Sequence, residues 1–113
     1  MDHHGLLLKA QQGDVNAFGE LYEQHAPGVF RFLYAHLEHR QDAEDLTEEV
    51  FFRAWRSLPH YHERGVPFQS YLLRIARNAL IDFHRRERSR GYQALRSVED
   101  KENELPDLQG NKP

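Results

Sequence analysis

The stretch from Pro67 to Arg90 has the spacing of an amphipathic helix. Its apolar residues recur at steps of three and four, which at about 100° per residue places them on one helical face. These residues are Phe68, Tyr71, Leu72, Ile75, Ala76, Ala79, Leu80 and Phe83. We therefore expect this face to pack into the core, with the other helices of the chain as its scaffold.

Two earlier segments, Val15 to Leu37 and Asp42 to Leu58, carry the same pattern. The apolar face of the first consists of Phe18, Leu21, Tyr22, His25, Val29, Phe32, Leu33 and Leu37, and that of the second of Ala43, Leu46, Val50, Phe51, Ala54, Trp55 and Leu58. Asp14 is well placed to cap the first segment. Pro27 inside that segment must kink the helix or divide it in two.

Short connections separate these helices. The apolar patch from Leu6 to Ala10, which Gly13 can stop, predicts only a turn or two of helix at the start of the chain. The stretch from Leu58 to Pro67 contains two prolines and a glycine, which indicates a loop with Pro67 at the first position of the next helix. Because β-branched residues are few, we predict an all-α fold, a compact bundle of three to four helices.

Composition limits the chain to one small domain. Its 113 residues suit a single hydrophobic core, and the helical pattern decays after Arg90 into a segment with an excess of acidic residues. We expect a helical domain over residues 1–92 and an acidic flexible linker over residues 93–113.

Several chemistries are excluded by what the sequence lacks. It has no cysteine, which removes disulfides, thiolate zinc ligands and cysteine nucleophiles. No apolar run approaches the roughly 20 residues that span a bilayer, and the N-terminus lacks the apolar region of a signal peptide. We therefore expect a cytoplasmic protein with no membrane partner.

The helix from Pro67 to Arg90 is strongly basic within an acidic chain. Six arginines against two carboxylates give it a local balance of +4, whereas the whole chain carries −3. Its polar arc, opposite the apolar stripe, holds Ser70, Arg74, Arg77, Asn78, His84, Arg85 and Arg88, with Leu73 and Ile81 among them. A basic helix with interleaved aromatic residues indicates a polyanion partner. The alternative is that the arginines only make an exposed helix face polar and bind no partner.

Uncharged residues of this region add groups that can recognise a base. The amide of Asn78 offers both a donor and an acceptor to a base edge. Tyr61, Phe68 or Tyr71, at the end of the loop, can stack on an unpaired base.

The helix from Asp42 to Leu58 has an unusual outer side. Asp45, Glu48, Glu49, Arg53 and Arg56 cover the side away from the core, and Phe52 falls in the middle of this polar arc. A phenyl ring surrounded by charged residues resembles a binding hot spot with a polar rim. The alternative is an ordinary solvated face.

A metal site and catalysis are both weakly supported. His60 and His62 flank Tyr61 and could chelate an ion together with Glu63, but no independently placed third ligand is apparent. His25 and His36 lie on an apolar helix face, which favours core histidines. No Gly-rich phosphate loop or pair of carboxylates suggests an enzyme, so we expect no catalytic residue, metal or cofactor.

Three stretches together resemble region 2 of bacterial sigma factors of the extracytoplasmic-function (ECF) group, within the sigma-70 family. They are Ala17-Phe18-Gly19-Glu20-Leu21-Tyr22, the run from Asp42 (Asp-Ala-Glu-Asp-Leu-Thr-Glu-Glu-Val-Phe-Phe-Arg-Ala-Trp-Arg) and the run from Phe68 (Phe-Gln-Ser-Tyr-Leu-Leu-Arg-Ile-Ala-Arg-Asn-Ala-Leu-Ile-Asp-Phe-His-Arg-Arg). The resemblance covers roughly residues 6 to 90, in the family's order and spacing.

The resemblance implies a transcription initiation module. Its acidic helix would bind the clamp helices of the RNA polymerase β′ subunit, and its basic helix the non-template strand of the −10 promoter element, which it helps to melt. Asn78 matches the position at which the family holds a flipped base, with the loop Tyr61 to Pro67 as the pocket wall. An anti-sigma factor is a further candidate partner.

Two sets of contact residues follow. For the polymerase we expect Asp45, Glu48, Glu49, Phe52 and Arg56. For DNA we expect Tyr61, Arg64, Phe68, Tyr71, Arg74, Arg77, Asn78, Ile81, His84, Arg85 and Arg88.

The sequence departs from the family's pattern at three points. Glu48 stands where Gln is common, and Tyr71 where Trp is common. The sequence also stops before a second helix-turn-helix domain, so residues 93–113 would be a linker toward an absent region 4 domain, or the chain is a lone domain. The alternative function is a protein-interaction module, such as a decoy that binds polymerase or an anti-sigma factor without reading DNA.

Overall fold

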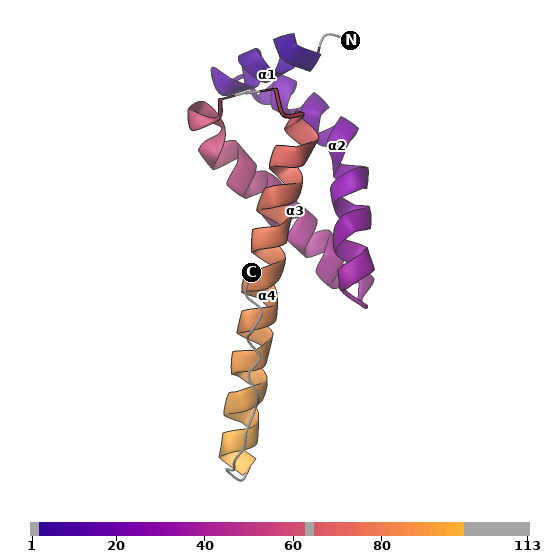
Figure 1. Ribbon diagram of the computed structural model, residues 1–113, viewed down its shortest axis with the longest axis vertical. Helices are drawn as coiled ribbons and strands as arrows, with labels where there is room; N and C mark the ends of the chain where they lie inside the picture. The colour runs from indigo at the N-terminus through magenta and orange to yellow at the C-terminus, as the bar shows by residue number, and fades with distance from the viewer. Residues whose placement is uncertain (1–2, 63–64, 99–113) are drawn as a thin grey trace. The chain divides into compact units, whose positions relative to one another are not determined.

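The structure, a computed structural model, describes residues 3–62 and 65–98. Over these residues the chain forms α1 (His3–Gln11), α2 (Val15–His36), α3 (Arg40–Ser57), the 3-10 turn η1 (Leu58–His60) and α4 (Phe68–Val98), as Figure 1 shows. The described residues contain no strand, which confirms the predicted all-α fold. The chain divides into two compact units, residues 1–79 and residues 80–113, and α4 contributes to both.

The joint between α1 and α2 is set by two neighbouring residues. Gly13 has a φ of +96°, which favours glycine. The Gly13 amide donates to the carbonyl of Ala10 and the Asp14 amide to that of Lys9, both at 3.0 Å, as in a Schellman helix end. The Asp14 carboxylate then accepts from the Ala17 amide at 3.1 Å. Both the predicted stop at Gly13 and the predicted cap at Asp14 are confirmed.

Helix α1 contributes more to the core than the sequence predicted. It has nine residues rather than a turn or two, and it buries Leu7 and Ala10. The side-chain amide of Gln11 donates to the carbonyls of Leu58, at 3.2 Å, and Tyr61, at 2.8 Å. Figure 1 shows α1 at the end of the bundle where α3 ends and α4 begins. The expectation of only a turn or two of helix is therefore wrong, and α1 closes this end of the core.

Helix α2 is continuous, with Pro27 inside it. The alternative of two helices divided at Pro27 is therefore wrong. A proline removes one backbone hydrogen bond from the helix interior. The helix continues because apolar side chains are buried on both sides of Pro27, notably Leu21, Val29 and Leu33.

The core draws on α1, α2, α3, η1 and the first part of α4. Its largest fully buried side chains are Phe68, Leu7, Leu21, Leu33, Leu58, Leu72, Val29 and Val50. Aromatic rings join α2 to α3: the ring of Phe51 lies 4.7 Å from that of Tyr22, and the ring of Phe18 lies 4.9 Å from that of Trp55. These helices bury the faces that their periodicity predicts.

Other expectations need correction at the level of single residues. Pro67 immediately precedes α4, and its carbonyl accepts from the amides of Ser70, at 2.9 Å, and Tyr71, at 3.4 Å, so it is not the first helical residue. His36, expected in the core, is exposed and bonds the carbonyl of Phe32. Helix α4 continues past Arg90 to its end at Val98. Residues 99–113 lie outside the described part, so the linker over 93–113 stays a prediction.

Among the described residues, no helix combines the length and apolar character needed to cross a membrane.

Candidate functional site

The outer face of α3 presents an exposed phenyl ring. Phe52 is 59% exposed, although the next residue back, Phe51, is buried against α2. The guanidinium carbon of Arg56 lies 5.5 Å from the centre of the Phe52 ring, so an arginine covers part of it. The sequence placed Phe52 correctly outside the core but did not predict this arginine contact.

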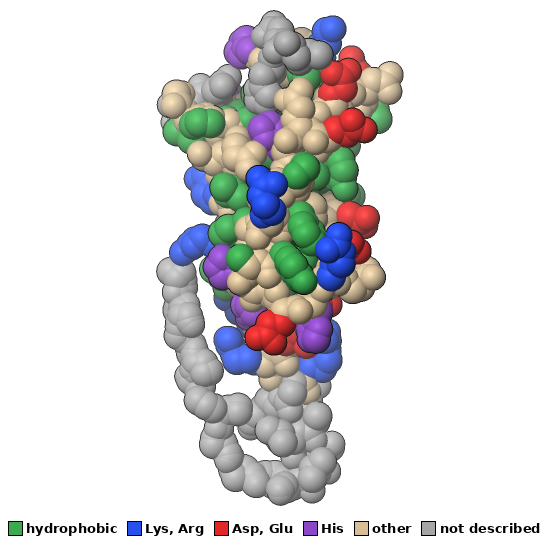
Figure 2. All heavy atoms as spheres, turned by 90° about the vertical axis from the view of Figure 1, so that its right-hand side faces the viewer, with side chains coloured by type: hydrophobic (Ala, Val, Ile, Leu, Met, Phe, Trp, Pro, Cys, Tyr) green, Lys and Arg blue, Asp and Glu red, His purple; other side chains and the backbone are tan. Residues whose placement is uncertain are grey.

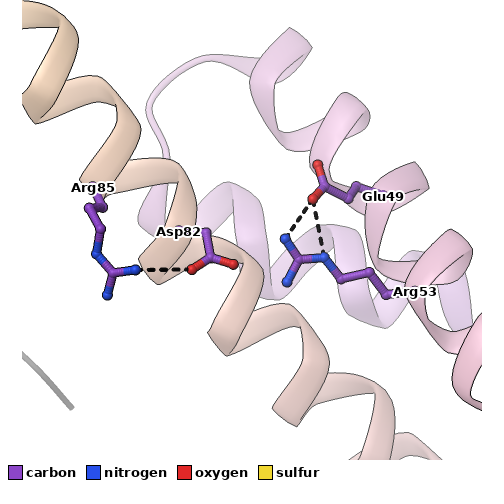
Figure 3. A network of polar contacts seen from close by, with 4 residues as sticks. All are labelled: Glu49, Arg53, Asp82 and Arg85. Atoms are coloured by element: carbon purple, nitrogen blue, oxygen red, sulfur yellow. Dashed lines mark hydrogen bonds and ion pairs between the residues drawn. The ribbon is translucent and has the colours of Figure 1, made fainter.

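The acidic residues around Phe52 are partly engaged within the helix. Glu49 is half-buried, and one of its carboxylate oxygens accepts from two nitrogens of Arg53, at 2.6 and 3.1 Å (Figure 3). Asp45 is exposed and accepts from the side chain of Gln41 at 2.9 Å. Glu48 is exposed as well. The outer face of α3 therefore combines an apolar centre with an acidic rim whose charge is partly balanced by arginines.

A groove that the sequence did not predict lies beside this face. It has a volume of about 390 Å³ and is lined by Tyr22, Ala26, Pro27, Phe30, Arg40, Glu44, Thr47 and Glu48 of α2 and α3. On the face drawn in Figure 2, apolar side chains reach the surface, and acidic side chains gather along one edge. Helix periodicity could not reveal the groove, because it forms where the flanks of two helices meet.

The first part of α4 presents cationic and amide groups to solvent. Arg74, Arg77 and Asn78 are all exposed. Within the described part of the chain, neither arginine forms an ion pair and the Asn78 side chain makes no hydrogen bond. These groups are thus available to a ligand, whereas Glu44, Asp45 and Glu49 of α3 are engaged within their own helix.

An aromatic cluster lies where the chain enters α4. The ring of Tyr61 is 4.3 Å from that of Tyr71 and 5.7 Å from that of Phe68, and the hydroxyl of Tyr71 is hydrogen-bonded to that of Ser57. Tyr61 and Tyr71 are half-buried and keep exposed surface. Phe68 is 2% exposed. The expectation that Phe68 stacks on a base is therefore corrected: its ring fills the core and supports the two tyrosines.

The remaining residues predicted to contact DNA belong to the second unit or lie outside the described part. Ile81 is half-buried, and His84, Arg85 and Arg88 are exposed. Arg85 pairs with Asp82 at 3.4 Å, as Figure 3 shows, whereas Arg88 has no carboxylate partner among the described residues. Arg64, in the loop, is outside the described residues.

The described residues contain no group of three or more His, Asp or Glu side chains placed to hold a metal ion. His60 and His62 are exposed, and the third residue considered for chelation, Glu63, lies outside the described part.

Comparison with known proteins identifies the family. Residues 21–90 match the Sigma-70 region 2 family. The chain is 39% identical over 85 residues to the ECF RNA polymerase sigma factor BldN of Streptomyces coelicolor, covering 75% of this chain and 32% of that protein. It is 40% identical over 75 residues to the ECF RNA polymerase sigma factor SigE of Mycolicibacterium smegmatis, covering 66% and 28%.

A solved structure supports the same family assignment. One chain of the RsbN–BldN complex superimposes with a TM-score of 0.65 and 34% identity, covering 77% of this chain and 63% of that one. The chain therefore belongs to the sigma-70 family, as a region 2 domain of the ECF group. It spans about a third of the length of the curated relatives named above.

Proposed function

We propose that this chain is the part of an ECF sigma factor that docks on RNA polymerase and recognises and helps to melt the −10 promoter element. The outer face of α3 binds the clamp helices of the β′ subunit through Phe52, with Asp45, Glu48, Glu49 and Arg56 as the rim. The polar face of α4 holds the non-template strand. The chain acts by binding and has no catalytic step.

The observation that carries this proposal is that key side chains on the two faces are exposed or have no partner within the described residues. Phe52 is the exposed ring that a docking surface needs, and Arg74, Arg77 and Asn78 have no protein partner among the described residues. An arginine contributes phosphate contacts that do not depend on sequence. An amide contributes hydrogen bonds to a particular base edge.

Tyr61 and Tyr71 complete the proposed DNA site. Their half-buried rings present aromatic surface beside the start of α4, and a base that leaves the stack gains about 1 to 3 kcal/mol from an aromatic side chain. Arg64 belongs to the same loop. Ile81, His84, Arg85 and Arg88 are proposed to extend the contacts along the helix.

A second candidate function is a protein-interaction module that does not read DNA. It is favoured by one finding: the similar solved structure is a complex of BldN with another protein, RsbN. By analogy, an anti-sigma factor is a candidate partner for this chain, and it would compete for the same exposed surfaces.

Two binding measurements on the full chain separate these functions. One uses immobilised RNA polymerase core, and the other uses single-stranded oligonucleotides scanned one base at a time. Binding to both polymerase and a preferred oligonucleotide supports the sigma factor function. Binding to polymerase with no base preference supports the interaction module. No binding to polymerase contradicts the sigma factor function and leaves an anti-sigma factor as the partner of an interaction module.

A further inference from the structure

Three helices each place one polar side chain on the segment from Tyr61 to Tyr71. Gln11 of α1 donates to the Tyr61 carbonyl, and Ser57 of α3 is hydrogen-bonded to the Tyr71 hydroxyl. From α2, Nδ1 of His25 lies 2.5 Å from the side-chain oxygen of Gln69. The residues that surround the proposed base pocket are therefore fixed by hydrogen bonds to side chains of α1, α2 and α3. The partners of these bonds lie 14 to 50 residues apart in the sequence.

In the hydrogen bond between His25 and Gln69, the donor and the acceptor can be assigned. The side-chain oxygen of Gln69 can only accept, so Nδ1 of His25 carries the proton. Both side chains are half-buried, and the His25 ring also lies edge-on to Phe68, with ring centres 5.4 Å apart. Through Phe68, this contact reaches the rings of Tyr61 and Tyr71.

Gly28 provides the space for this contact. A Cβ at position 28 would lie 2.5 Å from the side-chain nitrogen of Gln69, closer than real Cβ atoms approach. The Gln69 amide therefore rests against the backbone of α2, one turn beyond His25. A residue larger than glycine at position 28 must shift this amide, which is the flexible end of the Gln69 side chain. By contrast, a Cβ at Gly19 of the same helix meets nothing within 4 Å.

The position of Gln69 bears on the orientation of α4. Asn78 follows Gln69 by nine residues, about two and a half helical turns, so the two side chains leave the helix on opposite sides. When Gln69 is held against α2, Asn78 must point away from it, and Asn78 is indeed exposed. Tyr71 lies about 20° from Asn78 around the helix, two turns earlier.

We propose that His25 and Gln69, with Gly28, are positioning residues for base recognition. They touch no DNA themselves. They fix the rotation of the first turns of α4, so that Asn78 and the tyrosine pair face one pocket. This inference rests on the proposed function, and it adds residues of α2 to the determinants of promoter selectivity.

The test compares variants that release the Gln69 amide with variants that do not. Gln69→Met keeps the length of the side chain and removes its hydrogen bond, and Gly28→Ala displaces the amide without removing any polar group. Gln69→Glu keeps the acceptor. Gly19→Ala is the matched control for Gly28→Ala, and Gln24→Met, at an exposed position of α2, is the control for Gln69→Met.

The measurement is the ratio of dissociation constants for a scrambled and a preferred non-template oligonucleotide. We expect Gln69→Met and Gly28→Ala to lower this ratio by about fivefold to tenfold, the effect of one typical hydrogen bond. Binding to the scrambled strand should stay unchanged. Gln69→Glu, Gly19→Ala and Gln24→Met should keep the wild-type ratio.

A second readout does not depend on DNA. Amide hydrogen exchange of Tyr71 and Leu72 should become faster in Gln69→Met and Gly28→Ala than in their controls, because the first turns of α4 lose their anchor. The inference alone is overturned if Gln69→Met and Gly28→Ala both keep the wild-type ratio of dissociation constants. It is also overturned if these variants bind the preferred and the scrambled strand more weakly by the same factor. A wild-type chain that does not distinguish the strands overturns the proposed function, and this inference with it.

Discussion

The outer face of α3 and the polar face of α4 both carry many charges, but those charges have different partners. On α3 three of the acidic groups, Glu44, Asp45 and Glu49, are engaged with neighbours on the same helix. On the first part of α4, Arg74 and Arg77 have no such partner among the described residues. Under the proposed function, this difference predicts that α3 gains affinity for polymerase mainly by burying Phe52, whereas α4 gains affinity for DNA by charge and hydrogen bonds.

The largest expected effect is at the centre of the α3 face. Phe52→Ala should weaken binding to RNA polymerase core by about 2 kcal/mol or more, because it removes the exposed ring of the proposed hot spot. Its melting temperature should stay close to that of the wild type. Surface plasmon resonance and calorimetry on the same sample check both statements.

Phe51 provides the matched control, since it is adjacent in sequence but buried. Phe51→Ala should cost about 3 to 5 kcal/mol of unfolding free energy, as for other buried phenylalanines. If Phe52→Ala is as destabilising as Phe51→Ala, the proposed docking face belongs to the core and the comparison with α4 fails.

The next effect concerns the uncharged group on α4. Asn78→Ala should weaken binding to a preferred non-template strand by about 1 to 3 kcal/mol, because a base edge loses its hydrogen-bond partner. Binding to a scrambled strand and the melting temperature should hardly change. Titrating both oligonucleotides by fluorescence anisotropy tests this.

Asn16→Ala makes the same substitution at an exposed position of α2 and should change none of these quantities. Equal losses on the preferred and scrambled strands in Asn78→Ala would contradict the assignment of Asn78 to a base pocket.

The arginines of α4 should determine how steeply the affinity for single-stranded DNA falls with salt concentration. Arg74→Gln, Arg77→Gln and Arg88→Gln should each flatten the plot of log affinity against log salt by roughly 0.7 for a single strand. Arg85→Gln should have a smaller effect because Arg85 already forms an ion pair with Asp82. Arg31→Gln, on an exposed site of α2, is the control. Identical slopes in all variants would mean that α4 does not follow a phosphate backbone.

The smallest effect should come from the pair on α3. A double-mutant cycle with Glu49→Gln and Arg53→Gln should give a coupling of about 0.3 to 0.5 kcal/mol in unfolding free energy, the usual size for neighbours on a helix surface. Chemical denaturation of the four proteins measures it. A coupling of several kcal/mol would show that α3 depends on charge as much as α4 does.

Local periodicity accounts for what the sequence predicted well. The buried faces of α2 and α3, the cap at Asp14 and the outward position of Phe52 all follow from spacing within one helix. These features depend on residues a few positions apart, so a single sequence contains the information. The same holds for the exposure of Arg74, Arg77 and Asn78.

The missed features depend on contacts between distant residues. The bond of His25 to Gln69 joins positions 44 apart, and the bonds of Gln11 reach 47 and 50 residues along the chain. Nothing in the local pattern around any of these residues indicates its partner. The burial of Phe68 was ambiguous for the same reason, because an aromatic residue next to a loop can serve either the core or a ligand.

The closure of the core by α1 has a consequence for the order of folding during synthesis. Gln11 leaves the ribosome first, but its partner, the carbonyl of Tyr61, follows 50 residues later. At roughly 5 to 20 residues per second, the nascent chain needs about 3 to 10 s to supply that partner. During this interval Leu7 has no complete core to enter, because Phe68 and Leu72 of the same core have still to be made.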